Sequence, residues 1–172
     1  MSIISSLLTP ENMDTTGTPP KHQRKSKSSL RGLSRLCAVQ AVYRADFCQR
    51  KISSFLDDND SFGEVFLTET ISSKEMDREF FRDLLIKMEE NLDFVDAVIE
   101  EHLSANWRMD RLDPVIKYIL RLAITELYCF MEIPAKVVLN EYIEIAKAFS
   151  RDSETAFVNG LLNKALKAIR TS

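Results

Sequence analysis

The sequence predicts an all-α fold with six or seven helices. Residues 112–170 hold three helix patterns almost back to back, and apolar residues recur at three- and four-residue steps through most of the remaining chain. No stretch alternates well enough to predict a strand. At 172 residues, with 45% hydrophobic residues, the chain is long enough for one domain with its own core.

The amino-terminal region divides into a tail and a first helix. Residues 1–28 are rich in Ser, Thr, Pro and Lys without apolar periodicity, so we predict a disordered basic tail there and a helical domain over 29–172. The expected core-facing side of the first helix consists of Leu33, Leu36, Gln40, Tyr43 and Phe47. The expected off-core side consists of Lys27, Arg31 and Arg35, continued by Ala38 and Val42.

The middle of the chain has an irregular part followed by two helices. Residues 51–74 contain an acidic and glycine-bearing break in the pattern, which predicts a mobile connection. Residues 74–102 then predict two helices with a bend near Asn91, and Trp107 lies on the link to the next helix.

The carboxy-terminal third predicts three helices joined by short connections, hence antiparallel neighbours. Asp113 and Pro114 supply a capping side chain and a first-turn proline at the start of the first of these helices. Its apolar stripe consists of Ile116, Leu120, Ala123, Leu127 and Phe130. The second begins at Pro134 and its expected apolar residues are Val137, Val138, Ile145, Ala146 and Phe149, with Glu141, Glu144 and Lys147 on the solvent side. The third covers about 153–170, with Val158, Leu161, Leu162, Ala165 and Ile169 inward.

Charge is distributed unevenly along the chain. The formal net charge is −3, yet residues 1–36 hold six Lys/Arg and only two Asp/Glu. A basic end on an acidic body is typical of an anion-binding arm, although a merely solubilising tail is the alternative. No apolar run is long enough for a membrane span, and the first residues lack the features of a secretory signal, so we expect a cytoplasmic protein.

The residue pattern argues against catalysis. Two histidines in unrelated positions give no triad, four scattered glycines give no phosphate loop, and three cysteines without a C-x-x-C pair give no zinc site. We therefore expect no enzyme activity, no cofactor and no metal, and buried free thiols for the cysteines.

Two sets of residues are candidate RNA contacts. Lys27, Arg31 and Arg35 have the four-residue spacing to meet successive phosphates, with Lys25 of the tail upstream. Asn159, Asn163 and Lys167, with Arg170, share the side of the last helix opposite its apolar stripe, although spacing alone favours an ordinary solvated face. Gly160 lies within this helix at a cost of about 1 kcal/mol relative to alanine. Its presence indicates close approach to the backbone, either by a packed helix or by a nucleotide chain.

Several segments, in order and spacing, resemble the NusB family of bacterial transcription antitermination factors over about 29–170. They are Cys37-Ala-Val-Gln-Ala-Val-Tyr43, Phe81-Arg-Asp-Leu-Leu85, Leu120-Arg-Leu-Ala123 with Glu126-Leu127, Pro134-Ala-Lys-Val-Val-Leu-Asn-Glu141 running to Ile145-Ala-Lys147, and Phe157-Val-Asn-Gly160. The resemblance implies about seven helices in two packed antiparallel bundles, no catalysis, and binding of boxA RNA from ribosomal RNA transcripts. The implied partners are NusE, a ribosomal small-subunit protein, with NusA, NusG and RNA polymerase in the larger complex.

The resemblance also assigns roles to single residues. Arg31 and Arg35 match the family's RNA contacts, while Tyr43 and Glu126 match residues on the NusE side. Tyr43 as a core residue and Glu126 as a merely exposed one are the alternatives. The family's arginine run is denser than here, which shifts expected RNA affinity toward Lys25 and Lys27.

Three further readings stay open at this point. The same fold occurs fused to RNA methyltransferases, a protein-only adaptor would leave the tail passive, and a homodimer could hide the binding face. Where the family tends to have a lysine and an aspartate, this chain has Ala156 and Asn163, two changes with opposite expected effects on RNA binding.

Overall fold

The computed structural model describes residues 27–56, 76–103 and 107–170. Its elements are α1 (Lys27–Phe47), α2 (Ser53–Leu56), α4 (Arg78–Glu90), α5 (Leu92–His102), the 3-10 turn η3 (Met109–Arg111), α6 (Pro114–Cys129), α7 (Ala135–Phe149) and α8 (Asp152–Arg170). These three ranges contain no strand, and the predicted all-α class is confirmed. Most of the predicted tail over 1–28, and of the predicted mobile connection over 51–74, lies outside the described residues.

Local capping chemistry sets the starts of two helices, of which the start of α6 lies where the sequence predicted it. The Asp113 carboxylate accepts from the backbone N–H of Val115 at 2.8 Å, at the proline-led start of α6. Asp77 caps α4 in the same way by accepting from Phe80 N–H at 3.0 Å. The predicted bend falls at Asn91, which ends α4 and precedes α5.

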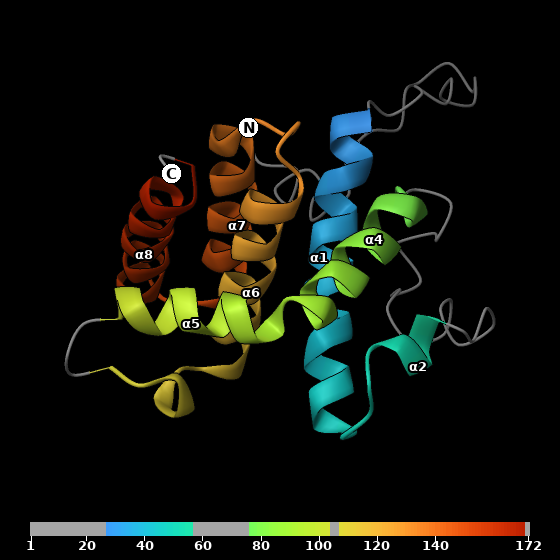
Figure 1. Cartoon of the computed structure of the whole chain (residues 1–172), viewed down its shortest axis with the longest axis horizontal. Helices are drawn as coiled ribbons and strands as arrows, with labels where there is room; N and C mark the ends of the chain where they lie inside the picture. Colours follow the sequence, from blue (N-terminus) through green and yellow to red (C-terminus); the bar gives the residue numbers. More distant parts are fainter. Residues whose placement is uncertain (1–26, 57–75, 104–106, 171–172) are drawn as a thin grey trace, which may run out of the picture.

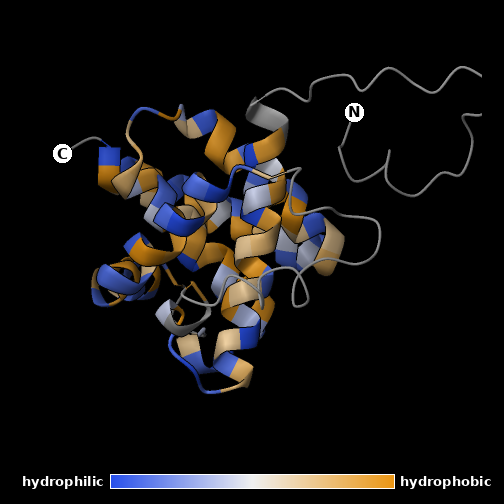
Figure 2. Ribbon diagram, turned by 90° about the vertical axis from the view of Figure 1, so that its right-hand side faces the viewer, coloured by the Kyte–Doolittle hydropathy of each residue, from blue (hydrophilic) through white to orange (hydrophobic). Residues whose placement is uncertain are grey.

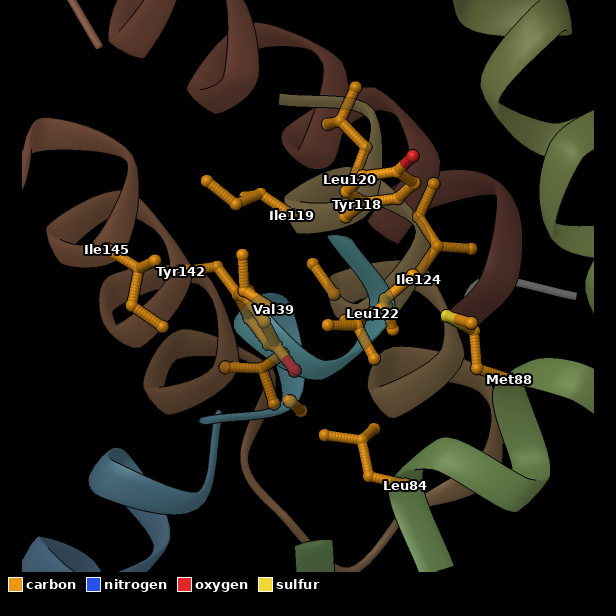
Figure 3. Packing of buried hydrophobic residues seen from close by; sticks show 14 of the residues in the cluster. Val39, Leu84, Met88, Tyr118, Ile119, Leu120, Leu122, Ile124, Tyr142 and Ile145 are labelled. Atoms are coloured by element: carbon orange, nitrogen blue, oxygen red, sulfur yellow. The ribbon is translucent and has the colours of Figure 1, made fainter. Parts of the chain in front are cut away.

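Helix α6 is the centre of the fold. It packs against α8, α7, α1, α4 and α5, and most of its residues are buried. In Figure 1, α6, α7 and α8 stand side by side, α5 runs across their ends, and α1 with α4 lies on the other side. A single hydrophobic cluster fills the space between these helices, and Figure 3 shows part of it around Leu122 and Tyr142.

The face that α1 buries differs from the predicted one. The stripe expected in the core is the less buried side, with Tyr43 and Phe47 exposed and Leu33, Leu36 and Gln40 partly exposed. The residues buried instead are Ser34, Arg35, Cys37, Ala38, Val39, Ala41, Val42 and Ala45. The prediction that Ala38 and Val42 lie off the core is therefore wrong. Because α1 packs against α4, α6 and α7, its inner side needs small residues that let the helices approach closely.

Smaller differences occur on α7 and at the cysteines. Val137 and Phe149 were predicted inside and are exposed, whereas the other apolar residues predicted for α7 are buried. Cys37 is buried, and burial raises the pKa of its thiol to about 11. Cys48 is exposed, so the prediction of a buried thiol is wrong there. In Figure 2, which colours residues by hydropathy, the hydrophilic residues (blue) lie mostly on the outer sides of the helices.

Within the described ranges, no helix is both long and apolar enough to cross a membrane.

The inversion of the α1 face can be tested with one substitution on each side of the helix. Ala38→Met adds bulk at a position with no exposed surface, and overpacking of this kind lowers the free energy of unfolding by about 1–3 kcal/mol. Gln40→Met, on the partly exposed side, is expected to change it by less than about 0.5 kcal/mol. Urea denaturation of both variants measures the difference. A larger loss from Gln40→Met would contradict the observed face.

Candidate nucleic-acid and partner interface

The first predicted site residues meet in the interior. Arg35 and Glu126 form a two-pronged ion pair, with Nε 2.9 Å from Oε2 and Nη2 2.5 Å from Oε1. Their side chains are 2% and 0% exposed. The Arg35 guanidinium also lies over the Phe80 ring, 5.1 Å from its centroid. The prediction that Arg35 points away from the core is therefore wrong, and Glu126 presents no surface to a partner.

The environment of Arg35 favours the charged form of its guanidinium. Burial alone would lower the pKa of Arg35, but its hydrogen bond to Glu126 and the attraction of that carboxylate outweigh burial and raise the pKa. The Glu141 carboxylate, predicted on the solvent side of its helix, lies 3.6 Å from the Arg35 guanidinium, and one-quarter of its side chain is exposed. Burial raises the pKa of Glu141, opposed by the charge of Arg35. Tyr142 is fully buried beside these groups, and burial raises the pKa of its hydroxyl well above the ordinary value.

The basic start of α1 is partly engaged with the protein itself. Arg31 donates to the Asp77 carboxylate at 3.2 Å and lies 4.8 Å from the Phe80 ring centroid, with 26% of its side chain exposed. The backbone of Lys27 begins α1, but its side chain and all of Lys25 lie outside the described residues. The predicted stripe of three basic residues is thus reduced, at the described surface, to the exposed part of Arg31.

The opposite end of α1 offers an apolar surface. Tyr43 is 44% exposed and Phe47 is 79% exposed. The Tyr43 ring stands edge-on to Tyr118 with 6.2 Å between centroids, and the Tyr118 hydroxyl donates to Asp46. Tyr43 therefore lies at the surface, where the resemblance places it, while its role in partner binding remains a prediction. Exposed aromatic residues of this kind are common in protein interfaces.

The outer side of α8 is polar, as predicted from its spacing. Asn159, Asn163 and Lys167 are exposed, together with Lys164. The Asn163 amide donates to the side-chain oxygen of Asn159 at 2.8 Å, which fixes the two side chains against each other. These residues remain candidate RNA contacts.

Arg170 was predicted to share the outer face of α8, but its guanidinium instead contacts the backbone near the end of α6. Its guanidinium donates to the backbone oxygens of Leu127 at 3.2 Å and Ile133 at 3.1 Å. It therefore satisfies carbonyls at the carboxy-terminal end of α6 and in the following turn.

A stacked aromatic pair, formed by exposed Trp107 and partly buried Phe157, was missed in the sequence. Trp107 stacks on Phe157 of α8 with ring centroids 5.1 Å apart and an interplanar angle of 22°. Trp107 is 45% exposed and borders a cavity of about 90 Å³ that Phe157, Leu112 and Ile116 also line. The single tryptophan in a polar link could have indicated a contact at Trp107. Local spacing, however, cannot pair Trp107 with Phe157, which lies fifty positions later.

The described ranges hold no group of three or more His, Cys, Asp or Glu side chains that could bind a metal ion. The site is thus built from an internal ion pair and three outer features: the apolar side of α1, the polar side of α8 and the Trp107–Phe157 stack. This arrangement defines an all-α scaffold whose surfaces are suited to binding.

Comparisons with known proteins agree with this class. The NusB family model matches residues 33–167. Transcription antitermination protein NusB of Mannheimia succiniciproducens is 35% identical over 151 residues, covering 86% of this chain and 96% of that protein. The same protein of Psychromonas ingrahamii is 37% identical over 146 residues, covering 85% and 94%. The chain belongs to the NusB family, which consists of antitermination and RNA-binding factors and not of enzymes.

Solved structures give the same fold. NusB of T. maritima matches with a TM-score of 0.64 and 29% identity over 84% of this chain and 93% of that one. The NusB chain of a complex of antitermination factors NusB and NusE with double-stranded RNA matches with a TM-score of 0.65 and 26% identity, over 80% and 96%.

The buried ion pair makes a prediction about stability. Glu126→Leu leaves the Arg35 charge buried without its partner, so the free energy of unfolding should fall by about 3–5 kcal/mol. The double variant Arg35→Met/Glu126→Leu removes both charges and is expected to recover most of that loss. Chemical denaturation of the single and double variants measures both effects.

A matched control is the solvated pair of Arg108 and Asp110, whose side chains are 72% and 63% exposed. Asp110→Asn should change the free energy of unfolding by less than about 0.5 kcal/mol. A double variant as unstable as Glu126→Leu alone would show that the loss comes from packing and not from an unpaired charge.

Proposed function

We propose that this protein is a cytoplasmic transcription antitermination factor that binds boxA RNA of ribosomal RNA transcripts together with NusE. NusA, NusG and RNA polymerase complete the proposed complex. The observation that carries the proposal is the family match over residues 33–167, joined with the similarity to a NusB chain solved with NusE and double-stranded RNA. The same relatives give no support for catalysis.

The proposed RNA contacts are chosen by exposure. On α8 they are Asn159, Asn163 and Lys167, and we add Lys164 because it is exposed on the same helix. Of the basic residues near the start of α1, Arg31 is included for its exposed part, while Lys25 and Lys27 are kept from the sequence prediction alone. Arg35 is left out because its guanidinium is buried against Glu126. Lysine and amide donors suit phosphate oxygens, which fix a nucleic acid in place without reading its sequence.

The stacked pair of Trp107 and Phe157 supplies a second kind of contact. An exposed aromatic face can stack with a base, and such stacking contributes about 1–3 kcal/mol per base. Phe157 lies on α8, the helix that also presents the polar contacts. A strand of RNA that follows α8 would therefore meet donors and an aromatic surface on one helix.

The proposed NusE surface is the apolar side of α1, with Tyr43 and Phe47 at its centre. Glu126 is left out because none of its side chain is exposed. A homodimer would be expected to cover the same apolar surface, so self-association competes with NusE in this proposal. Ala38 and Val42 take no part in either contact, since both are buried.

Binding of RNA is tested by fluorescence anisotropy with a boxA RNA and a scrambled control, with and without NusE, across a salt series. We expect NusE to tighten boxA binding selectively. With roughly three to five phosphate contacts, the slope of log affinity against log salt should be about −2 to −4. Lys164→Ala and Lys167→Ala should each make that slope shallower by about 0.7. A flat salt response, or no RNA binding under any condition, would favour a protein-only adaptor.

The partner surface is tested by truncating its most exposed residue. Phe47→Ala removes an aromatic side chain that is 79% exposed, so folding stability should change little while NusE affinity falls about ten-fold or more. Met131→Ala is the control, because Met131 is 59% exposed in the turn between α6 and α7. Isothermal titration calorimetry gives both affinities, and sedimentation gives the oligomeric state. Equal NusE affinity in the two variants would remove α1 from the proposed interface.

A further inference from the structure

Gly160 lies in the middle of α8 with no structural need for a glycine. Its backbone is helical and the residue is exposed. A Cβ atom built at this position would meet no other atom within 4 Å. Glycine weakens a helix relative to alanine, and neither an unusual backbone conformation nor a neighbouring helix explains its presence here. Of the two explanations that the sequence left open, the structure excludes the packed helix.

A glycine that nothing inside the protein requires leaves the helix backbone open to a molecule from outside. We propose that the sugar-phosphate backbone of bound RNA crosses α8 at Gly160, in van der Waals contact with the helix backbone. This inference rests on the proposed RNA-binding function and adds the contact on which the RNA is seated. A Cβ at this position would hold the strand away from the helix by the width of a methyl group.

The residues around Gly160 favour a polyanion over a protein. The exposed residues on its side of α8 are Asp152 and Ser153 at the start of the helix, followed by Ala156, Asn159, Asn163, Lys164, Lys167 and Ala168. Beyond Glu154 the helix contains no acidic residue. Amide and ammonium donors match the phosphate and 2′-hydroxyl oxygens of RNA, whereas none of these exposed residues is a large aromatic of the kind expected at the core of a protein interface.

Two asparagines, Asn159 and Asn163, lie beside this contact on one side of Gly160. Asn163 donates to the side-chain oxygen of Asn159 and to its backbone oxygen, both at 2.8 Å. Asn159 directly precedes Gly160 and Asn163 follows it by three positions, so the bonded pair lies along one side of the glycine. Because the pair is already ordered, little conformational entropy is lost when RNA arrives. Lys164 and Lys167 follow one and two turns further along the helix.

The test is a graded series at Gly160, measured in the full chain with a boxA RNA and NusE. Gly160→Ala should raise the melting temperature by about 2–4 °C, because alanine favours the helix and meets no clash. The same variant should bind RNA at least ten-fold more weakly, and Gly160→Leu more weakly again. Opposite signs for stability and affinity separate a contact role from a folding role.

Ala148→Ser is the control, since it adds one heavy atom at an exposed position of α7 and should leave RNA affinity unchanged. If the wild-type chain binds RNA and Gly160→Ala binds it equally well, this inference is overturned while the proposed function stands. If the wild-type chain binds no RNA, both are overturned. Loss of NusE affinity by Gly160→Ala without RNA present would assign this face to the protein partner and overturn the RNA contact.

Discussion

The buried ion pair between Arg35 and Glu126 is the constraint on which the arrangement of the helices depends. It joins α1 to α6 at 2.5–2.9 Å. The same guanidinium approaches Glu141 of α7 and the Phe80 ring of α4. Removing two charges from water is costly, and the attraction between them offsets that cost only when the geometry is close to ideal. A rotation of α1 by one residue, about 100°, would carry Arg35 away and leave the Glu126 carboxylate buried without its partner.

This constraint explains the surfaces as well as the core. With Arg35 turned inward, the small residues on its side of α1 face the neighbouring helices, and the aromatic side with Tyr43 and Phe47 faces solvent. The protein thereby keeps exposed aromatic side chains that an isolated helix pattern would place inside. Exposed aromatic area on a chain with a well-filled core points to a partner surface, because the core does not need it.

Much of the fold could be predicted because its signals are local. The start of α6 follows from the capping of Asp113, the bend at Asn91 from a break in apolar spacing, and the buried side of α8 from periodicity. The buried side of α1 could not be predicted from periodicity. Periodicity gives most weight to large apolar residues, whereas the buried side of α1 consists mainly of small ones. The partner of Arg35 is 91 positions away, and no local pattern connects them. Polar residues on α8 were correctly placed outside because that helix has one dominant buried side.

The charge of the whole chain says little about where a polyanion can bind. The net charge is −3, and the acidic residues are concentrated after the first 36 positions. At physiological salt the Debye length is about 8 Å, so a phosphate group responds to charges within one or two helix turns. What matters for RNA binding on α8 is therefore its local net charge. Lys164 and Lys167 lie on a stretch of the helix that has no acidic residue after Glu154. Arg170 contributes less positive charge to the outer face of α8 than its sequence position suggests, because its guanidinium is directed toward a backbone oxygen of the turn after α6. An acidic protein can thus present a cationic helix face, and only the folded arrangement shows which cations belong to it.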